Sequence, residues 1–110
     1  MKIQTRKTEQ GVEILRFDGE LDFHASGEVR EALTKLTDAQ SPKILLDLGG
    51  ISYIDSSGLA VFVEAFQKLK RYGGKLVLFN LVPAVRSVFE IARLDSIFKI
   101  AASEKEALSF

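Results

Sequence analysis

The sequence contains no cysteine and a single histidine, and it has no excess of charge of either sign. Without cysteine, the chain has no disulfide framework and no thiolate metal site. Fifteen basic and fifteen acidic residues give a formal net charge of zero. The chain therefore lacks the overall positive field that attracts proteins to nucleic acid or to anionic lipid. We expect no nucleic-acid partner and no bound cofactor, and look instead to a protein partner or a small molecule.

Long hydrophobic runs are also missing. Apolar stretches such as Leu59 to Val63 are far shorter than the ~20 residues of a membrane-spanning helix. The first ten residues, MKIQTRKTEQ, lack the apolar core of a signal peptide. At 110 residues, the chain has the length of one domain. The expectation is a single cytoplasmic domain over residues 1–110 with no membrane partner.

The first third of the chain predicts a hairpin followed by a helix. Two β-like segments, MKIQTRK and Val12–Phe17, flank a turn at Glu9-Gln10-Gly11, which is typical of an antiparallel pair. Residues 19–22 then interrupt the β-like pattern. Apolar residues then recur at the spacing of one helical face: Val29, Ala32, Leu33 and Leu36.

The remaining segments alternate between strand and helix. Residues 43–48 form a nearly unbroken apolar run before Gly49-Gly50, which is typical of a central strand covered on both faces. Helical spacing returns between Leu59 and Phe66, and this helix is expected to end at Gly73-Gly74. Further elements are expected as a strand at 75–79, a helix from Pro83, a strand at 97–100 and a helix capped by Ser103 and Glu106.

This alternation predicts parallel pairing through right-handed crossovers, with the first hairpin adding an antiparallel strand. The expected fold class is therefore α/β, with a mixed, mostly parallel sheet of four to five strands and about four helices packed against it. In open sheets of this class, functional groups collect beyond the carboxyl ends of the strands. The segment Ile51–Gly58, between the central strand and the longest helix, is expected there.

Within that region, SYIDSSGLAVF (Ser52–Phe62) places an acid and two hydroxyls in front of a glycine and an apolar run. Asp55, Ser56 and Ser57 all stand where a helix N-cap belongs, so capping explains part of the pattern. One capping residue would suffice, however, and Gly58 keeps a side chain out of the first turn. The pattern therefore also predicts close approach of another backbone and an exposed hydroxyl.

Three enzymatic interpretations fit these residues less well. A serine hydrolase elbow needs G-x-S-x-G, but neither Ser56 nor Ser57 has a glycine two residues earlier, and His24 is expected in a loop or at a helix start. A triad assembled by the fold stays open at this point. The glycine pairs lack the spacing of a Walker loop. Asp47 lacks the acidic pair that a receiver domain uses to hold a divalent cation, so it is expected to be structural.

Four segments together resemble the STAS domain family, and within it the bacterial anti-sigma factor antagonists: Gly19–Asp22, Ile44–Leu48, Tyr53–Leu59 and Gly73–Leu76. The resemblance spans nearly the whole chain, and its D-S-[ST]-G-L element is fairly specific. It implies a switch protein that is not an enzyme. In that family, a serine-kinase anti-sigma factor phosphorylates the serine directly after the aspartate, which here is Ser56.

The resemblance also implies how such a switch works. The unphosphorylated antagonist binds the anti-sigma factor and frees a sigma factor, the phosphorylated form dissociates, and a serine phosphatase resets it. Asp22, Asp55, Ser56, Ser57 and Gly58 form the implied contact surface of a chain expected to be a monomer when free. Many members carry glycine where this chain has Ala60, and a methyl group there narrows which partners fit. An alternative is a STAS module of another signalling assembly, without phosphorylation or with a nucleotide or lipid at the same loop.

Overall fold

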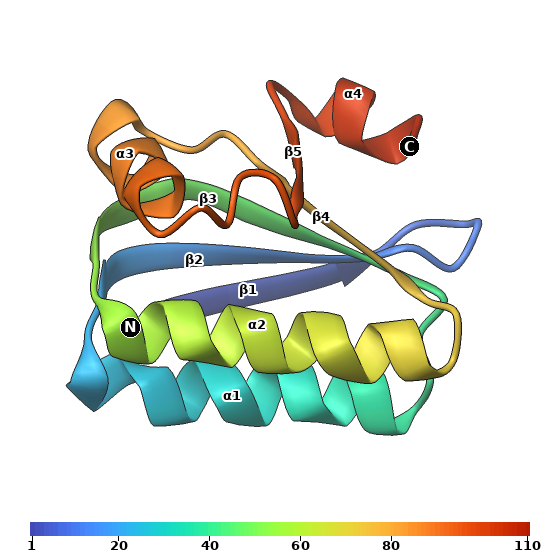
Figure 1. Ribbon diagram of the computed structural model, residues 1–110. Coiled ribbons are helices and arrows are strands. Elements are labelled where there is room, and N and C mark those ends of the chain that lie inside the picture. Colours follow the sequence, from blue (N-terminus) through green and yellow to red (C-terminus); the bar gives the residue numbers. More distant parts are fainter.

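Nine elements follow one another in the computed structural model, which describes residues 1–110 (Figure 1). They are β1 (Lys2–Lys7), β2 (Glu13–Leu21), α1 (Phe23–Asp38), β3 (Lys43–Ile54), α2 (Ser56–Arg71), β4 (Lys75–Phe79), α3 (Pro83–Ile91), β5 (Lys99–Ala101) and α4 (Glu104–Leu108). The strands form one sheet in the order β1-β2-β3-β4-β5. Only the β1–β2 pair is antiparallel, so the predicted mixed, mostly parallel sheet with four helices is confirmed.

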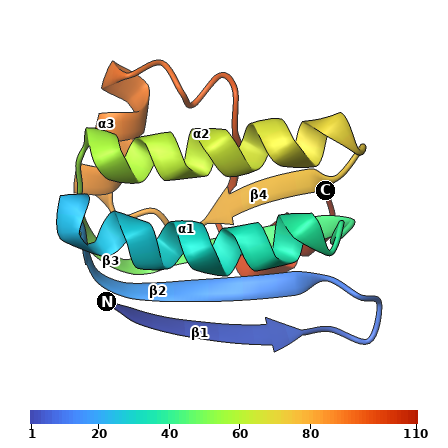
Figure 2. The ribbon, with the colours of Figure 1, turned by 90° about the horizontal axis from the view of Figure 1, so that it is seen from below.

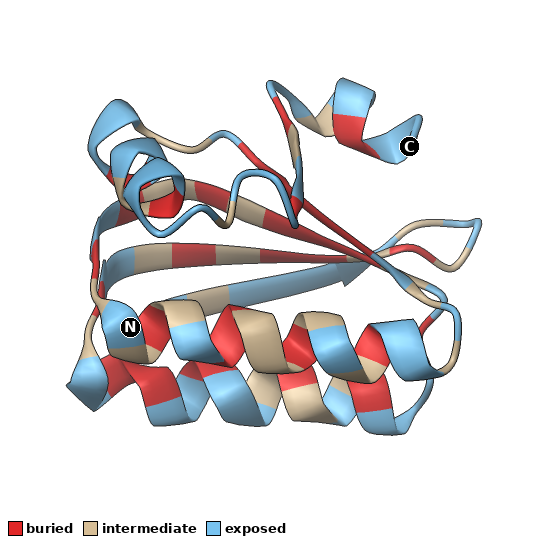
Figure 3. Ribbon diagram, in the orientation of Figure 1, coloured by how far each residue is buried: buried red, intermediate tan, exposed pale blue.

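The helices cover both faces of this sheet. α1 and α2 lie side by side on one face (Figure 2), and Val85 and Phe89 of α3 belong to the same core, whereas α4 packs on the opposite face (Figure 1). Alternate residues of β3 supply the two sides, because successive side chains of a strand point to opposite faces. Ile44 and Leu46 belong to the core beneath α1 and α2, and Leu45 to a smaller cluster that includes Ala107 of α4. Burial on both faces explains the unbroken apolar run in β3 (Figure 3).

Two strands are longer than the sequence predicts. β3 continues through the glycine pair to Ile54, and β2 continues through residues 19–21, so taking these glycines as strand boundaries was wrong. A Cβ atom on Gly50 would lie 2.6 Å from the carbonyl oxygen of Phe17. Glycine is therefore needed inside β3, where β2 approaches closely and the pairing register shifts. The short β5 also begins two residues later than the predicted strand at 97–100.

The predicted helix boundaries agree with the structure. α2 ends where Gly73 adopts a φ of +81° and the amide of Gly74 donates to the carbonyl of Leu69 at 2.8 Å. This is the glycine-dependent end that the sequence predicted. Pro83 begins α3, and the hydroxyl of Ser103 caps α4 by accepting from the Glu106 amide at 3.2 Å.

Asp47 has the structural role expected of it. Its carboxylate accepts hydrogen bonds from Arg16 at 3.1 Å and from the amide of Gly49 at 3.0 Å. Arg16 also contacts Asp18 at 3.1 Å. Hydrogen bonds from the guanidinium to Asp18 and Asp47 raise the pKa of Arg16 above its ordinary value. These contacts tie β2 to β3 on the side of the sheet facing away from α1 and α2.

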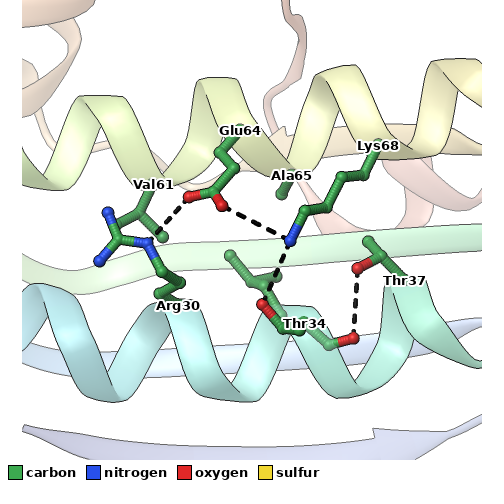
Figure 4. Close-up of a pocket in the computed structure, with 8 residues that line it drawn as sticks. Arg30, Thr34, Thr37, Val61, Glu64, Ala65 and Lys68 are labelled. Carbon is green, nitrogen blue, oxygen red and sulfur yellow. Dashed lines mark hydrogen bonds and ion pairs between the residues drawn. The ribbon is translucent and has the colours of Figure 1, made fainter.

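Charged side chains bridge the outer groove between α1 and α2 (Figure 4). Glu64 accepts from Nε of Arg30 at 2.8 Å and lies 3.5 Å from Nζ of Lys68. The hydrogen bond from Arg30 is the main cause that lowers the pKa of Glu64, and Lys68 adds to it, while partial burial opposes the shift. The bridge therefore favours the ionised carboxylate in the folded state.

Replacing Glu64 by glutamine should cost little stability, and only where the carboxylate is ionised. Since the side chain is 39% exposed, we expect the free energy of unfolding to fall by about 0.2–1 kcal/mol at pH 7. A lowered folded-state pKa stabilises the fold above the unfolded value of about 4.3, and this contribution is lost as the pH falls through the folded value.

Urea unfolding of wild type and Glu64→Gln at pH 7 and pH 3 measures this. The difference should be smaller at pH 3 than at pH 7. Glu31→Gln is the matched control, because Glu31 is an exposed residue of α1 that makes no ion pair. An equal cost at both pH values would show that the bridge does not depend on the charge of Glu64.

Candidate functional site

Two helices begin next to each other at the carboxyl edge of the sheet. In the parallel pairing of β2 with β3, Leu21 lies opposite Ile54, so Asp22 and Asp55 follow at neighbouring positions. The amide of Asp55 donates to the carbonyl of Leu21 at 3.3 Å, which joins the two strand ends directly. Both views show the starts of α1 and α2 at this same edge (Figures 1 and 2). The pairing of strands thus brings together the two acids that the sequence singles out.

Each aspartate caps the helix that follows it. Asp22 Oδ1 accepts from the Ala25 amide at 3.1 Å. Asp55 Oδ1 accepts from the amides of Ser57 at 2.9 Å and Gly58 at 3.2 Å, and the Asp55 carbonyl accepts from Leu59 at 3.1 Å. The capping interpretation is confirmed, and the capping residue of α2 is Asp55 rather than either serine. The first turn therefore offers a partner the serine hydroxyls and the amide of Ser56, which has no acceptor within the chain.

The two serine side chains are presented differently. Ser56 is exposed and Ser57 is half-buried, and neither hydroxyl takes part in a hydrogen bond. Ser56 is the first residue of α2, so its side chain stands at the positive end of the helix dipole. The exposed hydroxyl that the sequence predicts is therefore found at Ser56.

Gly58 does not lie on the exposed surface, and here the sequence-based expectation was wrong. The residue is buried, and an added Cβ would lie 2.7 Å from Cγ of Leu21 and 2.9 Å from the Leu21 carbonyl oxygen. The backbone that approaches Gly58 is therefore that of β2 in the same chain. Valine at this position should disturb folding first, and not chiefly the binding of a partner.

Two exposed aromatic residues lie close in sequence to the capping aspartates and were missed at the sequence level. Phe23, directly after Asp22, is 73% exposed, and Tyr53, two residues before Asp55, is 51% exposed. The sequence pattern did indicate that both side chains are exposed. Phe23 falls off the buried stripe of α1 that contains Val29 and Leu33, and Tyr53 alternates with the buried Ile54. His24 is exposed in the first turn of α1, as expected.

Residues 3–107 match the sequence model of the STAS domain. This chain belongs to the STAS domain family. It is 39% identical over 88 residues to the anti-sigma-B factor antagonist of Listeria monocytogenes, which covers 80% of this chain and 77% of that one. It is 31% identical over 105 residues to the anti-sigma-B factor antagonist of Bacillus subtilis, with coverage of 96% and 94%.

Among solved structures, this STAS domain is similar to the Bacillus cell fate determinant SpoIIAA in its phosphorylated form. The TM-score is 0.76 at 26% identity, and the match covers 98% of this chain and 97% of that one. The family resemblance read from the sequence is thus confirmed. These relatives have the names of regulators and not of enzymes. No helix of this STAS domain has the length and apolar character needed to cross a membrane.

The burial of Gly58 predicts that alanine there destabilises the fold. Overpacking typically costs about 1–3 kcal/mol, which outweighs the gain of up to about 1 kcal/mol from replacing glycine within a helix. Gly27 in α1 is the matched control, because an added Cβ there meets nothing within 4 Å. Urea unfolding should show Gly58→Ala less stable than wild type and Gly27→Ala equal or more stable. A Gly58→Ala protein as stable as wild type would contradict the packing described here.

Proposed function

We propose that this STAS domain is an anti-sigma factor antagonist controlled by phosphorylation of Ser56. In its unphosphorylated form it binds an anti-sigma factor that is also a serine kinase, and a sigma factor is released. Phosphorylation of Ser56 ends this binding, and a serine phosphatase restores it. The observation that carries the proposal is the exposed, unbonded hydroxyl of Ser56 directly after the capping Asp55, in a chain whose relatives are named anti-sigma factor antagonists.

The residues around Ser56 suit a protein-binding surface. Exposed aromatic side chains often supply a large share of binding energy in such interfaces, and Phe23 and Tyr53 supply two of them here. Ala60 is exposed one turn after Ser56 and shares its side of α2. Its methyl group is therefore placed to influence which partner fits. Asp22, Asp55 and Ser57 complete the proposed contact surface, whereas Gly58 supports it from beneath.

A phosphate on Ser56 should affect binding far more than folding. Within the isolated domain, a negative group at a helix N-terminus gains about 0.3–1 kcal/mol. Repulsion from Asp55 and the neighbouring Asp22, screened by solvent, opposes this gain. In a docked interface, the phosphate must instead lose its water. A charge buried without a partner typically costs about 2–5 kcal/mol, or roughly thirty-fold to several thousand-fold in affinity.

Phosphorylation should occur at Ser56 and not at Ser57. Wild type, Ser56→Ala and Ser57→Ala are each incubated with ATP and an extract of the cells that make the protein, and intact mass and phosphopeptides are then measured. We expect one added phosphate on wild type and on Ser57→Ala, and none on Ser56→Ala, because Ser56 is the exposed serine. Full modification of Ser56→Ala, with none of Ser57→Ala, would move the site to Ser57. If no protein is modified, this chain is a STAS module that works without the proposed switch.

An acidic residue at Ser56 should reproduce part of the effect of phosphate. Once the kinase is purified, calorimetric titration should show Ser56→Asp binding it at least about ten-fold more weakly than wild type, with the phosphorylated protein weaker still. Melting temperatures should differ by less than about 5 °C.

The matched control for Ser56→Asp is Ser109→Asp, which adds the same charge at the exposed position directly after α4, a helix on the opposite face of the sheet from α1 and α2 (Figure 1). This control should bind like wild type. A phosphorylated protein that melts many degrees lower, and loses binding only in proportion to unfolding, would mean that the switch acts through the fold.

A further inference from the structure

Three lysines meet on the face of the sheet that α4 covers. Lys43 lies directly opposite Lys75 in the parallel pairing of β3 with β4. Lys99 of β5 lies opposite Val77, two residues along β4 from Lys75. Because side chains alternate along each strand, these lysines share the side of the smaller core cluster that packs against α4. Three positive charges on neighbouring strands therefore lie on one surface, which we call the lysine cluster.

No acidic side chain balances the lysine cluster. None of its three lysines forms an ion pair with an acidic side chain. Two acids of the nearby α4 are engaged elsewhere, Glu104 with Arg6 and Glu106 with the amide of Ala102. Like charges directly opposite each other in a sheet repel one another. The cluster is thus a local excess of positive charge in a chain whose formal net charge is zero.

The amine of Lys43 is held in a defined position beside the other two lysines. Its Nζ donates to the carbonyl oxygens of Leu108 at 2.9 Å and Phe110 at 2.7 Å, where the chain leaves α4. A protonated lysine has three N–H donors and no lone pair. The neutral amine has two N–H bonds, one for each of these carbonyls, and keeps its lone pair free. The two carbonyls can therefore position the neutral amine without blocking it as a nucleophile.

The surroundings of Lys43 also favour its neutral form. Burial is the main cause that lowers the pKa of Lys43, and the charges of Lys75 and Lys99 lower it further. Lys43 is only half-buried, so a small molecule can still reach its amine. Lys75 and Lys99 are exposed, and positive charges gathered on one surface raise the local concentration of anions. The cluster therefore combines a nucleophile with a means of attracting a negatively charged reagent.

We propose that Lys43 is the preferred site at which this chain is acylated by small acyl phosphates. The neutral amine attacks the acyl carbon and forms an amide bond with it. The bond from that carbon to the phosphate oxygen breaks, phosphate leaves with the bonding electrons, and the proton lost by the amine passes to water. Lys75 and Lys99 attract the phosphate group of the reagent and stabilise it as it leaves. Acetyl phosphate is a simple member of this class and serves as the probe.

Acylation of Lys43 also affects how the end of the chain is held. The acylated nitrogen carries one hydrogen, so at most one of the carbonyls of Leu108 and Phe110 keeps its donor. The positive charge at this nitrogen is lost as well. Both residues are exposed, and few other contacts hold them. The last residues should therefore be held less firmly on the sheet after acylation.

Reaction with acetyl phosphate tests the site. The full chain is incubated with the reagent at pH 8 and low salt, and peptide mass spectrometry follows the acetylation of every lysine. We expect an initial rate at Lys43 at least about five-fold that at Lys2 and Lys35, which are exposed and lie outside the cluster. This preference should shrink with added salt, and also with acetic anhydride, which carries no charge. Acetylation of Lys43 no faster than that of Lys2 and Lys35 would overturn the proposal.

Variants test whether the cluster activates Lys43. Lys75→Gln with Lys99→Gln should slow the acetylation of Lys43 at least about three-fold, with melting temperatures showing that the protein stays folded. The matched control is Lys2→Gln with Lys35→Gln, which removes the same charge from exposed lysines outside the cluster and should leave the rate at Lys43 unchanged. Equal slowing in both double variants would reduce the effect to net charge, and slowing in neither would show that the cluster is inactive. Either result would overturn the proposal.

Lys43→Gln removes the same charge as acylation and tests the release of the chain end. Trypsin should cut after Lys105 at least about three-fold faster in this variant than in wild type, because local opening exposes the backbone to cleavage. Lys35→Gln is the matched control and should be cut like wild type. Cleavage of Lys43→Gln at the wild-type rate would overturn the proposed effect on the chain end.

A further variant keeps this proposal separate from the proposed switch. Ser56 follows the carboxyl end of β3, whereas Lys43 begins that strand. Ser56→Asp should therefore be acetylated at Lys43 at the wild-type rate. A changed rate at Lys43 in this variant would show that the two sites are coupled and would contradict an activation that depends on the lysine cluster alone.

Discussion

The packing of Gly58 against the ends of β2 and β3 is the constraint on which the proposed site depends. Because Gly58 has no side chain, the first turn of α2 rests directly on Leu21 and Ile54. The hydrogen bond from the Asp55 amide to the Leu21 carbonyl fixes the same junction. The chain therefore turns from β3 into α2 beside the place where it turns from β2 into α1. Ser56 is directed outward as a consequence, with Asp22 and Asp55 turned back onto their own helices.

Much of the fold could be predicted from the sequence because local patterns and tertiary packing agree. The apolar run in β3 is buried on both faces, and Gly73 ends α2 in the conformation that only glycine adopts easily. The sequence-based predictions failed where a contact between distant parts of the chain requires a glycine. Gly50 was taken as the end of a strand, yet it lies inside β3 because the Phe17 carbonyl approaches it. A single sequence shows that a side chain is missing, but not which neighbour requires its absence.

The same limit explains how far the site could be predicted. Asp55 and Ser56 follow from local chemistry, since a cap and the first helical residue are neighbours in the chain. Whether the absent side chain of Gly58 makes room for a partner or for β2 depends on a contact with Leu21, thirty-seven positions earlier in the sequence. The role of Phe23 could be predicted only in part. Its position off the apolar stripe of α1 was visible, but its place at the edge where α2 also begins depends on the pairing of β2 with β3.

The charged side chains at the two ends of α2 match the sign of the helix dipole. Its N-terminal end is capped by Asp55, and its last turn carries Lys68, Lys70 and Arg71, as expected where a helix is negative. If the dipole were the only reason for cations at that end, they would be confined to the helix, because its effect fades within one turn. Lys75 and Lys99 lie instead on β4 and β5, on the face of the sheet that also carries Val77. Three elements therefore place positive charge at this end of the sheet, which a helix terminus alone does not explain.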